Sequence, residues 1–178
     1  MTASAGRDLE SRVKDSHHQA LKLWLRLLSC TTRIEGVIRN RLRCEFAITL
    51  PRFDLLAQLE REPDGLTMGE LSQRLMVTGA NVTGITDQLE AEGLVTRAMH
   101  PTDRRAFAVQ LTARGRRQFR RMAAIHEQWV IELFAGWDNK QKNQMYALLA
   151  SLKQHVATVG GQPIKRRKNK DRAKEHAA

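Results

Sequence analysis

One stretch of the sequence decides the fold: residues Leu66–Gly115 read LTMGELSQRLMVTGANVTGITDQLEAEGLVTRAMHPTDRRAFAVQLTARG. It opens on Thr67-Met68-Gly69-Glu70, a Ser/Thr-x-x-Glu capping box, in which the hydroxyl and the carboxylate each satisfy a free amide at a helix start. Leu71 and Leu75 follow four residues apart, on one face of the helix that this box begins. The stretch therefore predicts a short helix at its start.

A second helix is predicted directly after the first. Thr78 is a suitable N-cap for it, and Gly93 ends it, because glycine readily takes the backbone conformation that terminates helices. The apolar residues between them recur three and four positions apart and form a buried stripe of Val82, Ile85 and Leu89.

Two short strands complete the stretch, over residues 94–99 and 107–111. The polar residues 100–105 between them form a hairpin loop with two arginines at its tip. Two short helices, a turn and a hairpin predict a winged helix-turn-helix, an arrangement suited to reading DNA.

The charge is strongly basic but unevenly distributed. The formal net charge is +11 and the sequence pI is near 10.5, which favours an anionic partner. Residues 49–112 nevertheless carry 6 Lys and Arg against 9 Asp and Glu, whereas residues 113–178 carry 15 against 5. The predicted DNA-reading part is thus slightly acidic, and its affinity for phosphates must come from a few placed arginines and from the flanking segments.

Long helices are predicted on either side of the winged part. Between about residues 15 and 45, apolar residues recur three and four apart, and a second face is apolar as well. Such a helix must be covered on more than one side, and in a chain this short a partner subunit is the easiest cover. Further helices are predicted from Thr49, over residues 112–136, and from Asp138, which begins an Asp-x-x-Gln variant of the capping box.

The predicted fold is therefore mainly α with a small β-hairpin wing: a winged helix-turn-helix with long dimerisation helices from both ends of the chain. The predicted organisation is a flexible N-terminal tail (1–15), a dimerisation helix (16–48), the winged helix-turn-helix DNA-binding domain (49–112), further dimerisation helices (113–158) and a basic disordered tail (159–178). Within that tail, residues 165–174 hold seven Lys and Arg against one Asp. This run is either a tethered contact to the DNA backbone or a solubilising segment.

The second helix of the motif would read DNA bases. Turning 100° per residue from its buried stripe places small and polar residues outward, so the helix can enter a major groove. Asn81 and Gln88 can pair with the edge of adenine, and Thr83 can contact a phosphate or a thymine methyl group. The alternative is an amphipathic helix whose outer face meets only solvent. The predicted DNA-binding residues of this segment are Thr78, Ala80, Asn81, Thr83, Gly84, Asp87 and Gln88.

The wing supplies the second set of predicted contacts. Arg105 is expected to enter the minor groove, Arg104 to contact a phosphate, and Asp103 to hold an arginine in position. Asp87 is expected to pair with these wing arginines, which would fix how wing and helix sit together. A solvated turn is the alternative. Beyond the wing, arginines that either line the same DNA backbone or only solvate their helix are Arg114, Arg116, Arg117, Arg120 and Arg121.

At this point the sequence resembles a known family. The spacing of Asn81-Val82-Thr83-Gly84, Leu89-Glu90, Gly93-Leu94-Val95, Asp103-Arg104-Arg105, Thr112 and Gly115 is similar to the signature of the multiple antibiotic resistance regulator (MarR) family. The resemblance covers about residues 16–158. It implies a cytoplasmic homodimer whose first and last two helices interlock, usually a repressor, with Asp103 and Arg105 in the wing and residues 78–88 as the recognition segment.

The resemblance also implies a small, often aromatic or anionic, effector that releases operator DNA. Its pocket would lie among the first long helix, the helix from Pro51 and the helix from Thr112. Core packing is the alternative for the aromatic and methionine candidates, and a solvated face for the arginines. Residues 23–43 also look similar to regulators of hydroxycinnamate catabolism that sense aromatic acyl-CoA thioesters, so the effector is expected to be an aromatic acid or its CoA thioester. The candidates are His17, Trp24, Arg26, Arg33, Arg39, Phe53, Met122, His126 and Trp129.

The two cysteines, Cys30 and Cys44, fall in one predicted helix and too far apart for a disulfide bond, which fits a reducing cytoplasm. Cys30 is either a redox sensor close to Arg33 or, because it borders the apolar stripe, a buried inert thiol. The sequence has no apolar run of membrane-spanning length, no zinc-type spacing and no nucleophile–base set. We therefore expect no membrane association, metal, cofactor or enzymatic activity.

Two functional hypotheses follow. The first is a ligand-responsive dimeric repressor bound to a palindromic operator with half-sites about one helical turn apart. The second is a sequence-tolerant architectural DNA-binding protein that relies on the basic tail and the arginines after the wing.

Overall fold

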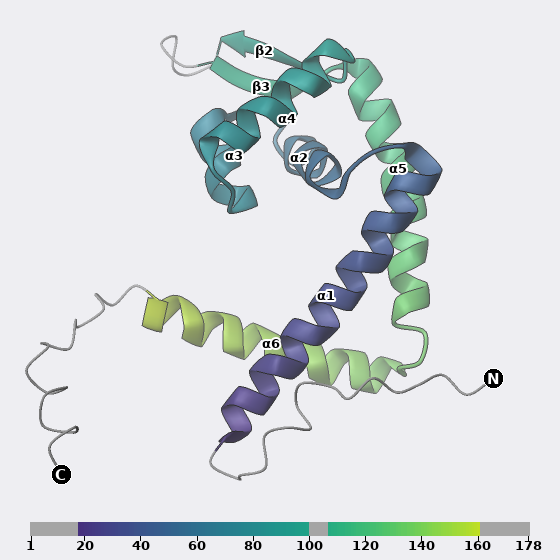
Figure 1. The fold of residues 1–178 in the computed structure, drawn as a ribbon, viewed down its shortest axis with the longest axis vertical. Helices are drawn as coiled ribbons and strands as arrows, with labels where there is room; N and C mark the ends of the chain where they lie inside the picture. The colour runs from purple at the N-terminus through teal and green to yellow at the C-terminus, as the bar shows by residue number, and fades with distance from the viewer. Residues whose placement is uncertain (1–17, 100–106, 161–178) are drawn as a thin grey trace, which may run out of the picture. The chain divides into compact units, whose positions relative to one another are not determined.

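The protein is described by a computed structural model over residues 18–99 and 107–160. The chain divides into two compact units, residues 1–133 and 134–178. Its described part is mainly helical with one small antiparallel sheet, which confirms the predicted fold class (Figure 1). The elements are α1 (Gln19–Phe46), α2 (Leu50–Glu60), β1 (Leu66–Thr67), α3 (Met68–Leu75), α4 (Gly79–Ala91), β2 (Val95–Met99), β3 (Phe107–Leu111), α5 (Ala113–Leu133) and α6 (Asn139–Gly160).

Two of the predicted helix starts have the predicted capping bonds. The Glu70 amide donates to Thr67 Oγ1 at 3.2 Å, and the Thr67 amide donates to Glu70 Oε2 at 2.8 Å. At α6 the Gln141 amide donates to Asp138 Oδ1 at 2.7 Å, and the Asp138 amide donates to Gln141 Oε1 at 2.9 Å. Thr78 is the N-cap residue of α4 as predicted, but its side chain makes no capping hydrogen bond.

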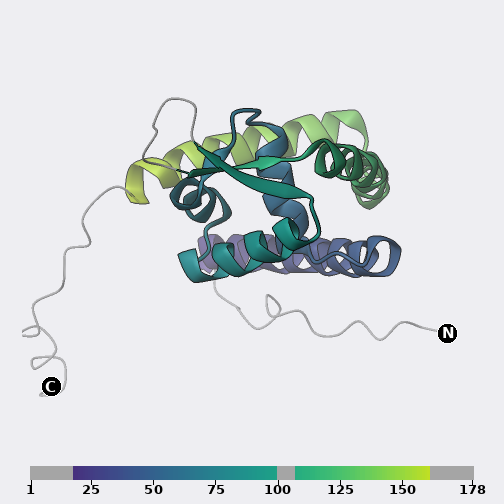
Figure 2. The ribbon, with the colours of Figure 1, turned by 90° about the horizontal axis from the view of Figure 1, so that it is seen from above.

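The sheet has three strands in the order β1-β3-β2, all antiparallel. β2 and β3 form the predicted hairpin, with Val95 opposite Leu111 and Met99 opposite Phe107, and Figures 1 and 2 show them side by side. β1, which pairs Leu66 with Val109, was not predicted. A two-residue strand shows no alternation, so its sequence carries no signal.

The core of the first unit lies where α2, α3, α4 and the sheet meet. α2 contributes Phe53, Leu55, Leu56 and Leu59, all buried. On α4 the predicted stripe holds, with Val82 and Leu89 fully buried and Ile85 packed against the core. Thr86 is also fully buried on α4, with its hydroxyl 3.9 Å from Met68 Sδ. This burial was missed because threonine is usually read as a surface residue.

One threonine joins the end of α4, the start of β2 and the start of α5. Gly93 ends α4 in the left-handed conformation, at φ +68°. The Thr112 hydroxyl donates to the Gly93 carbonyl at 2.8 Å and accepts from the Gly115 amide at 2.9 Å. A Cβ at Gly115 would lie 1.9 Å from the Leu94 carbonyl oxygen, so only glycine allows this approach. We call these four residues the Thr112 junction.

The two long terminal helices keep apolar surface exposed. On α1 only Ile38 and Leu42 are buried, whereas Trp24 remains 57% exposed. Among residues 139–159 of α6 none is buried, and the large apolar side chains that are exposed there are Tyr146, Leu148, Leu149, Leu152, Val156 and Val159. α5 ends at Leu133, three residues before the predicted end. None of the helices in the described ranges is both long and apolar enough to cross a bilayer.

Candidate nucleic-acid interface

The outward face of α4 is small and polar. Ala80, Asn81, Asp87 and Gln88 are exposed, as are Thr78, Thr83 and Gly84. A Cβ added at Gly84 would meet no atom within 4 Å, so this face has open space in front of it. A helix with such a face can lie deep in a major groove about 12 Å wide. Contact between these residues and DNA stays a prediction.

The structure favours one of the two DNA contacts predicted for Thr83. Its hydroxyl donates to the Gly79 carbonyl at 3.0 Å, one turn back along α4. Because phosphate oxygens carry no hydrogen to donate, Thr83 would have to break this bond to bind a phosphate. Its methyl group stays available, which favours a contact to a thymine methyl group.

The wing is attached to α4 by a side chain that was not among the predicted site residues. Arg97 on β2 forms ion pairs with both Asp87 and Glu90 of α4, and its backbone amide donates to Glu90 Oε1 at 3.1 Å. The hydrogen bond that Arg97 donates to the Asp87 carboxylate raises the pKa of the Arg97 guanidinium, although partial burial opposes it. Arg97 therefore fixes the first strand of the wing to the predicted recognition helix.

Arg97 is a partner of Asp87 that the sequence did not suggest. The expected partners were the tip arginines, which lie outside the described residues, so their pairing with Asp87 stays a prediction; within the described residues Asp87 pairs with Arg97, which lies further back in the hairpin. Arg97 was not among the predicted site residues, because its pairing depends on how β2 packs against α4 and not on its spacing along the chain. Asp103, Arg104 and Arg105 lie outside the described residues.

The arginines of α5 separate into two groups. Arg116 Nη1 and Arg120 Nε lie 3.1 and 2.8 Å from the carboxylate oxygens of Glu60 on α2. These two arginines thus hold α5 to α2. Within residues 18–99 and 107–160, the other three, Arg114, Arg117 and Arg121, have no carboxylate at ion-pair distance, and all are exposed.

Several carboxylates of the winged part form ion pairs. Glu92 at the end of α4 pairs with Arg52 of α2, and Glu62 lies 2.8 Å from Arg74 of α3. Together with the pairs of Glu60, Asp87 and Glu90, these contacts place five of the nine carboxylates of residues 49–112 beside guanidinium groups.

Three of the predicted effector residues lie in the core. Phe53 is 5% exposed and packs between Phe119 and His126, with ring centroids at 5.4 and 4.9 Å. Met122 and Trp129 are also buried. These three residues match the core-packing alternative.

The remaining effector candidates are spread over α1 and α5. Trp24, Arg33 and Arg39 are exposed on α1, and Arg39 lies 3.6 Å from Glu35. Arg26 is exposed on the same helix, and His17 lies outside the described residues. His126 on α5 is half-buried, and this burial lowers its pKa. The structure does not bring the α1 candidates together with the aromatic cluster around Phe53.

One carboxyl group of α2 has a raised pKa. Asp54 of α2 is half-buried, and burial raises the pKa of its carboxyl group. The charge of Glu35 on α1 raises it further. Sequence patterns gave no sign of this site, because the two residues belong to different helices.

Both cysteines are free and exposed. The expectation that Cys30 is buried is therefore wrong for the described residues, and whether its thiol is a redox sensor stays a prediction. Nowhere in the described ranges do three or more His, Cys, Asp or Glu side chains gather as a metal site would require.

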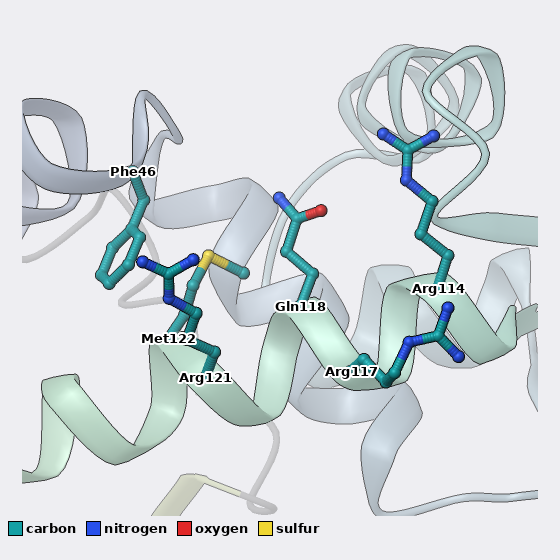
Figure 3. A pocket seen from close by; sticks show the side chains of 6 residues that line it. All are labelled: Phe46, Arg114, Arg117, Gln118, Arg121 and Met122. Atoms are coloured by element: carbon teal, nitrogen blue, oxygen red, sulfur yellow. The ribbon is translucent and has the colours of Figure 1, made fainter.

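A surface pocket of about 370 Å³ lies between the end of α1 and the first half of α5. It is lined by Phe46, Arg114, Arg117, Gln118, Arg121 and Met122, of which Met122 was an effector candidate and Arg114 a DNA-contact candidate (Figure 3). We call it the α5 pocket. Arg114, Arg117 and Arg121, which have no carboxylate at ion-pair distance among the described residues, all belong to it.

Comparisons of the chain with family models, curated proteins and solved structures agree on one family. A model of the MarR family matches residues 48–106. A MarR family transcriptional regulator from Silicibacter pomeroyi has 30% sequence identity and a TM-score of 0.69, over 81% of this chain and 99% of that one. The HTH-type transcriptional repressor YetL of Bacillus subtilis (strain 168) is 24% identical over 134 residues, which is 75% of this chain and 80% of YetL.

The fold is also similar to that of CouR from Rhodococcus jostii RHA1, whose crystal structure is bound to p-coumaroyl-CoA. The TM-score is 0.65 and the identity 21%, over 79% of this chain and 95% of that one. At that identity the likeness shows the fold alone.

Proposed function

The chain belongs to the MarR family of transcriptional regulators, which are DNA-binding proteins and not enzymes, and on that premise we propose that it is a dimeric repressor. In this proposal it binds a palindromic operator in the cytoplasm and leaves it when a small aromatic or anionic effector binds. The observation that carries the proposal is the exposed, small and polar face of α4, held to the wing through Arg97.

Reading of the operator is supported by the arrangement of α4 and the wing. Asn81 and Gln88 stand exposed on the face of α4 that is free of packing, where amide groups can pair with adenine. We propose that the pairs of Arg97 with Asp87 and Glu90 orient the hairpin relative to α4. We propose that α4 enters a major groove and that Arg105 at the wing tip enters the adjacent minor groove.

Dimerisation is supported by the apolar surface that each unit leaves exposed. Leu21, Trp24 and Leu28 of α1 are 44%, 57% and 45% exposed, and α6 carries a run of exposed leucines and valines. Exposed apolar side chains in rows along helices are typical of homodimer interfaces. We propose that the helices of residues 16–48 and 113–158 form it. A homodimer would present two copies of α4 to an operator with two-fold symmetry.

Two observations support a response to an effector: membership of the family and the similarity of the fold to that of CouR. The neighbour CouR binds p-coumaroyl-CoA, and an aromatic acid or its CoA thioester is the class of effector that we propose for this chain. Its effect would be to change how α4 meets the operator.

A DNase I footprint over the region upstream of the gene tests the proposal. We expect the full chain to protect an inverted repeat whose half-site centres are about one helical turn apart. A chain that ends before Lys165 should still protect the same repeat. If no repeat is protected and loss of the tail abolishes binding, the protein is instead a sequence-tolerant architectural DNA-binding protein with a steep dependence on salt.

A further inference from the structure

One face of the wing hairpin ends in two apolar side chains. Met99 of β2 and Phe107 of β3 lie directly opposite one another. Because side chains alternate between the two faces of a sheet, both share a face with Arg97, two positions before Met99. Arg97 pairs with Asp87 and Glu90 of α4, so Met99 and Phe107 belong to the side of the hairpin that packs against α4 (Figure 1). We call these two residues the wing apolar pair.

Exposure increases along this face toward the wing apolar pair. Val95 and Leu111, opposite one another at the start of the hairpin, are buried. Met99 and Phe107 are 57% and 64% exposed, although opposite side chains in a hairpin already cover part of one another. Among the residues that the structure describes, neither belongs to the hydrophobic core or packs against it. The apolar pattern of this face therefore continues beyond the part that the described chain covers.

β2 runs back along α4, from the end of the helix toward its start. Gly93 ends α4 just before β2, and Arg97 then pairs with Glu90 and, further back along the helix, with Asp87. Gly84 lies about one turn before Asp87, and a Cβ added there would meet no atom within 4 Å. Because the wing apolar pair comes after Arg97, the hairpin carries it toward the exposed part of α4 that is proposed to enter the major groove.

DNA bound to both elements would place one strand between α4 and the wing, because the two grooves lie on either side of each sugar–phosphate strand. The surface of that strand alternates phosphates with deoxyribose rings. Phosphates attract guanidinium and ammonium groups, whereas the C–H groups of a deoxyribose ring favour an apolar partner that loses water on contact. Methionine and phenylalanine match the sugar, and proteins that bind the minor groove use apolar side chains of the same types.

A second copy of the chain fits this surface less well. The apolar rows that are proposed to form the dimer interface lie on α1 and α6, whereas the wing apolar pair lies on the hairpin. Through the contacts of Arg97, the pair is continuous with the surface of α4 that is proposed to bind DNA. DNA is therefore the occupant that its position favours.

We propose that Met99 and Phe107 pack against deoxyribose rings of the DNA strand that lies between α4 and the wing. This contact depends neither on charge nor on base identity, so it positions the duplex while α4 reads the bases. The inference rests on the proposed function and deepens it, since it adds to the DNA interface two residues that no sequence pattern assigned.

Fluorescence anisotropy of the full chain at several salt concentrations tests the contact. The probes are the duplex protected in the footprint and a duplex of the same composition in shuffled order. Phe107→Thr and Met99→Thr remove the apolar group but keep a residue that favours strands. We expect each to lower the affinity for the protected duplex by about tenfold, because each removes apolar area that DNA would cover.

The dependence on salt separates a sugar contact from a displaced wing. A lost sugar contact releases no counterions, so the slope of log affinity against log salt should stay that of the unaltered chain. A variant that moved the whole wing off DNA would also lose phosphate contacts, and its slope would fall by about one for each. A loss of affinity with a reduced slope would thus overturn the proposal.

Two further variants are controls. Phe107→Leu keeps an apolar side chain and should keep the affinity of the unaltered chain. Thr96→Ala changes an exposed side chain on the other face of β2 and should change neither affinity nor slope. Circular dichroism shows that each variant is folded before it is titrated. Since Phe107→Thr and Met99→Thr carry the same expectation, either one tests the contact if the other fails to fold.

The outcomes also separate this inference from the proposed function. A protected duplex that both threonine variants bind as tightly as the unaltered chain does refutes the sugar contact and leaves the repressor. An unaltered chain that binds the shuffled duplex as tightly as the upstream region refutes the repressor. In that case the threonine variants are compared on the shuffled duplex, where a loss of affinity at constant slope still supports the contact.

Discussion

Arg97 and Asp87 form an ion pair that joins the wing to α4, the predicted recognition helix. Neither side chain is buried, so the pair contributes little to folding, on the order of 0.2–1 kcal/mol. We expect its larger effect to be on the orientation of the hairpin relative to α4. If α4 and the wing enter two adjacent grooves as proposed, operator binding depends on that orientation.

Arg97→Ala should therefore lower operator affinity more than it lowers stability. We expect a loss of about threefold to tenfold in affinity, measured by fluorescence anisotropy, and a loss of at most about 1 kcal/mol in the free energy of unfolding. Asp87→Ala should have a similar effect, and the double variant should lose no more than either single one. Arg39→Ala, which breaks an exposed pair on α1, is the control. Additive losses in the double variant would show that the two residues act on DNA independently.

Replacing glycine by alanine should have opposite effects on the free energy of unfolding at Gly115 and at Gly84. Gly115→Ala forces a Cβ to within 1.9 Å of the Leu94 carbonyl, so we expect a loss of at least about 3 kcal/mol in the free energy of unfolding. Gly84→Ala lies in an exposed helix with no atom within 4 Å of the new methyl group, so we expect a gain of about 0.5–1 kcal/mol. Urea denaturation measures both.

Gly84→Ala also tests the DNA-facing side of α4. If that face enters the groove, the added methyl group should weaken operator binding although the protein is more stable. Gly36→Ala provides the comparison, because it is exposed on α1 and also has open space around it. Unchanged operator affinity of Gly84→Ala would mean that this part of α4 does not approach DNA closely.

Arg105→Ala should weaken operator binding by about 1–3 kcal/mol, the scale of one good groove contact. The expected cause is the loss of a guanidinium from the minor groove. Anisotropy titrations at two salt concentrations check it, and size-exclusion chromatography confirms that the variant keeps its oligomeric state. An affinity equal to that of the unaltered chain would show that the wing tip does not touch DNA.

Stability should fall in mild acid because of His126. Burial lowers its pKa from the ordinary value of 6.5, so below pH 6.5 the unfolded chain binds more protons than the folded one. The stability that neutral His126 contributes is fully present above pH 6.5. It is lost as the pH falls through the pKa of His126 in the folded protein. His126→Phe retains a ring beside Phe53 and should reduce the acid-induced loss, measured by denaturation at pH 7.5 and pH 5.5. His155→Phe, at an exposed position on α6, should not.

Leu152→Asp should convert the proposed dimer into a monomer. Leu152 is 38% exposed on α6, in line with other apolar residues, and a charge there would lie unpaired in a dimer interface. Light scattering after size exclusion measures the mass, and operator affinity should fall with it. Lys153→Asp changes charge at the neighbouring, exposed position and serves as the control. A dimer that survives Leu152→Asp would place the interface elsewhere.

The sequence predicted the order of the elements because their signals are local. Capping boxes at Thr67 and Asp138, a left-handed glycine at Gly93 and the stripe of α4 each depend on residues within a few positions. The outward face of α4 followed from helical geometry alone. Family resemblance fixed the importance of Thr112 and Gly115, but only the structure gives the physical reason, which is the Thr112 junction.

What the sequence missed depends on contacts between distant elements. The ion pairs of Arg97 and of Glu60 each join two different elements, so no spacing along the chain predicts them. The same holds for the effect of Glu35 on the pKa of Asp54. The α5 pocket was missed for a related reason. Its arginines were read as one run with Arg116 and Arg120, and only the fold shows which of them α2 has already engaged.

The Thr112 junction has a mechanical consequence. The Thr112 hydroxyl donates to the carbonyl of Gly93, just after α4, and accepts from the amide of Gly115 in the first turn of α5, where α5 lies too close to Leu94 for a Cβ to fit. We expect the end of α4, the start of β2 and the start of α5 to move together as one rigid body. In the proposed repressor, release of DNA would then require a movement of the whole winged part. Induction would appear as a changed spacing between the two winged parts of the proposed dimer.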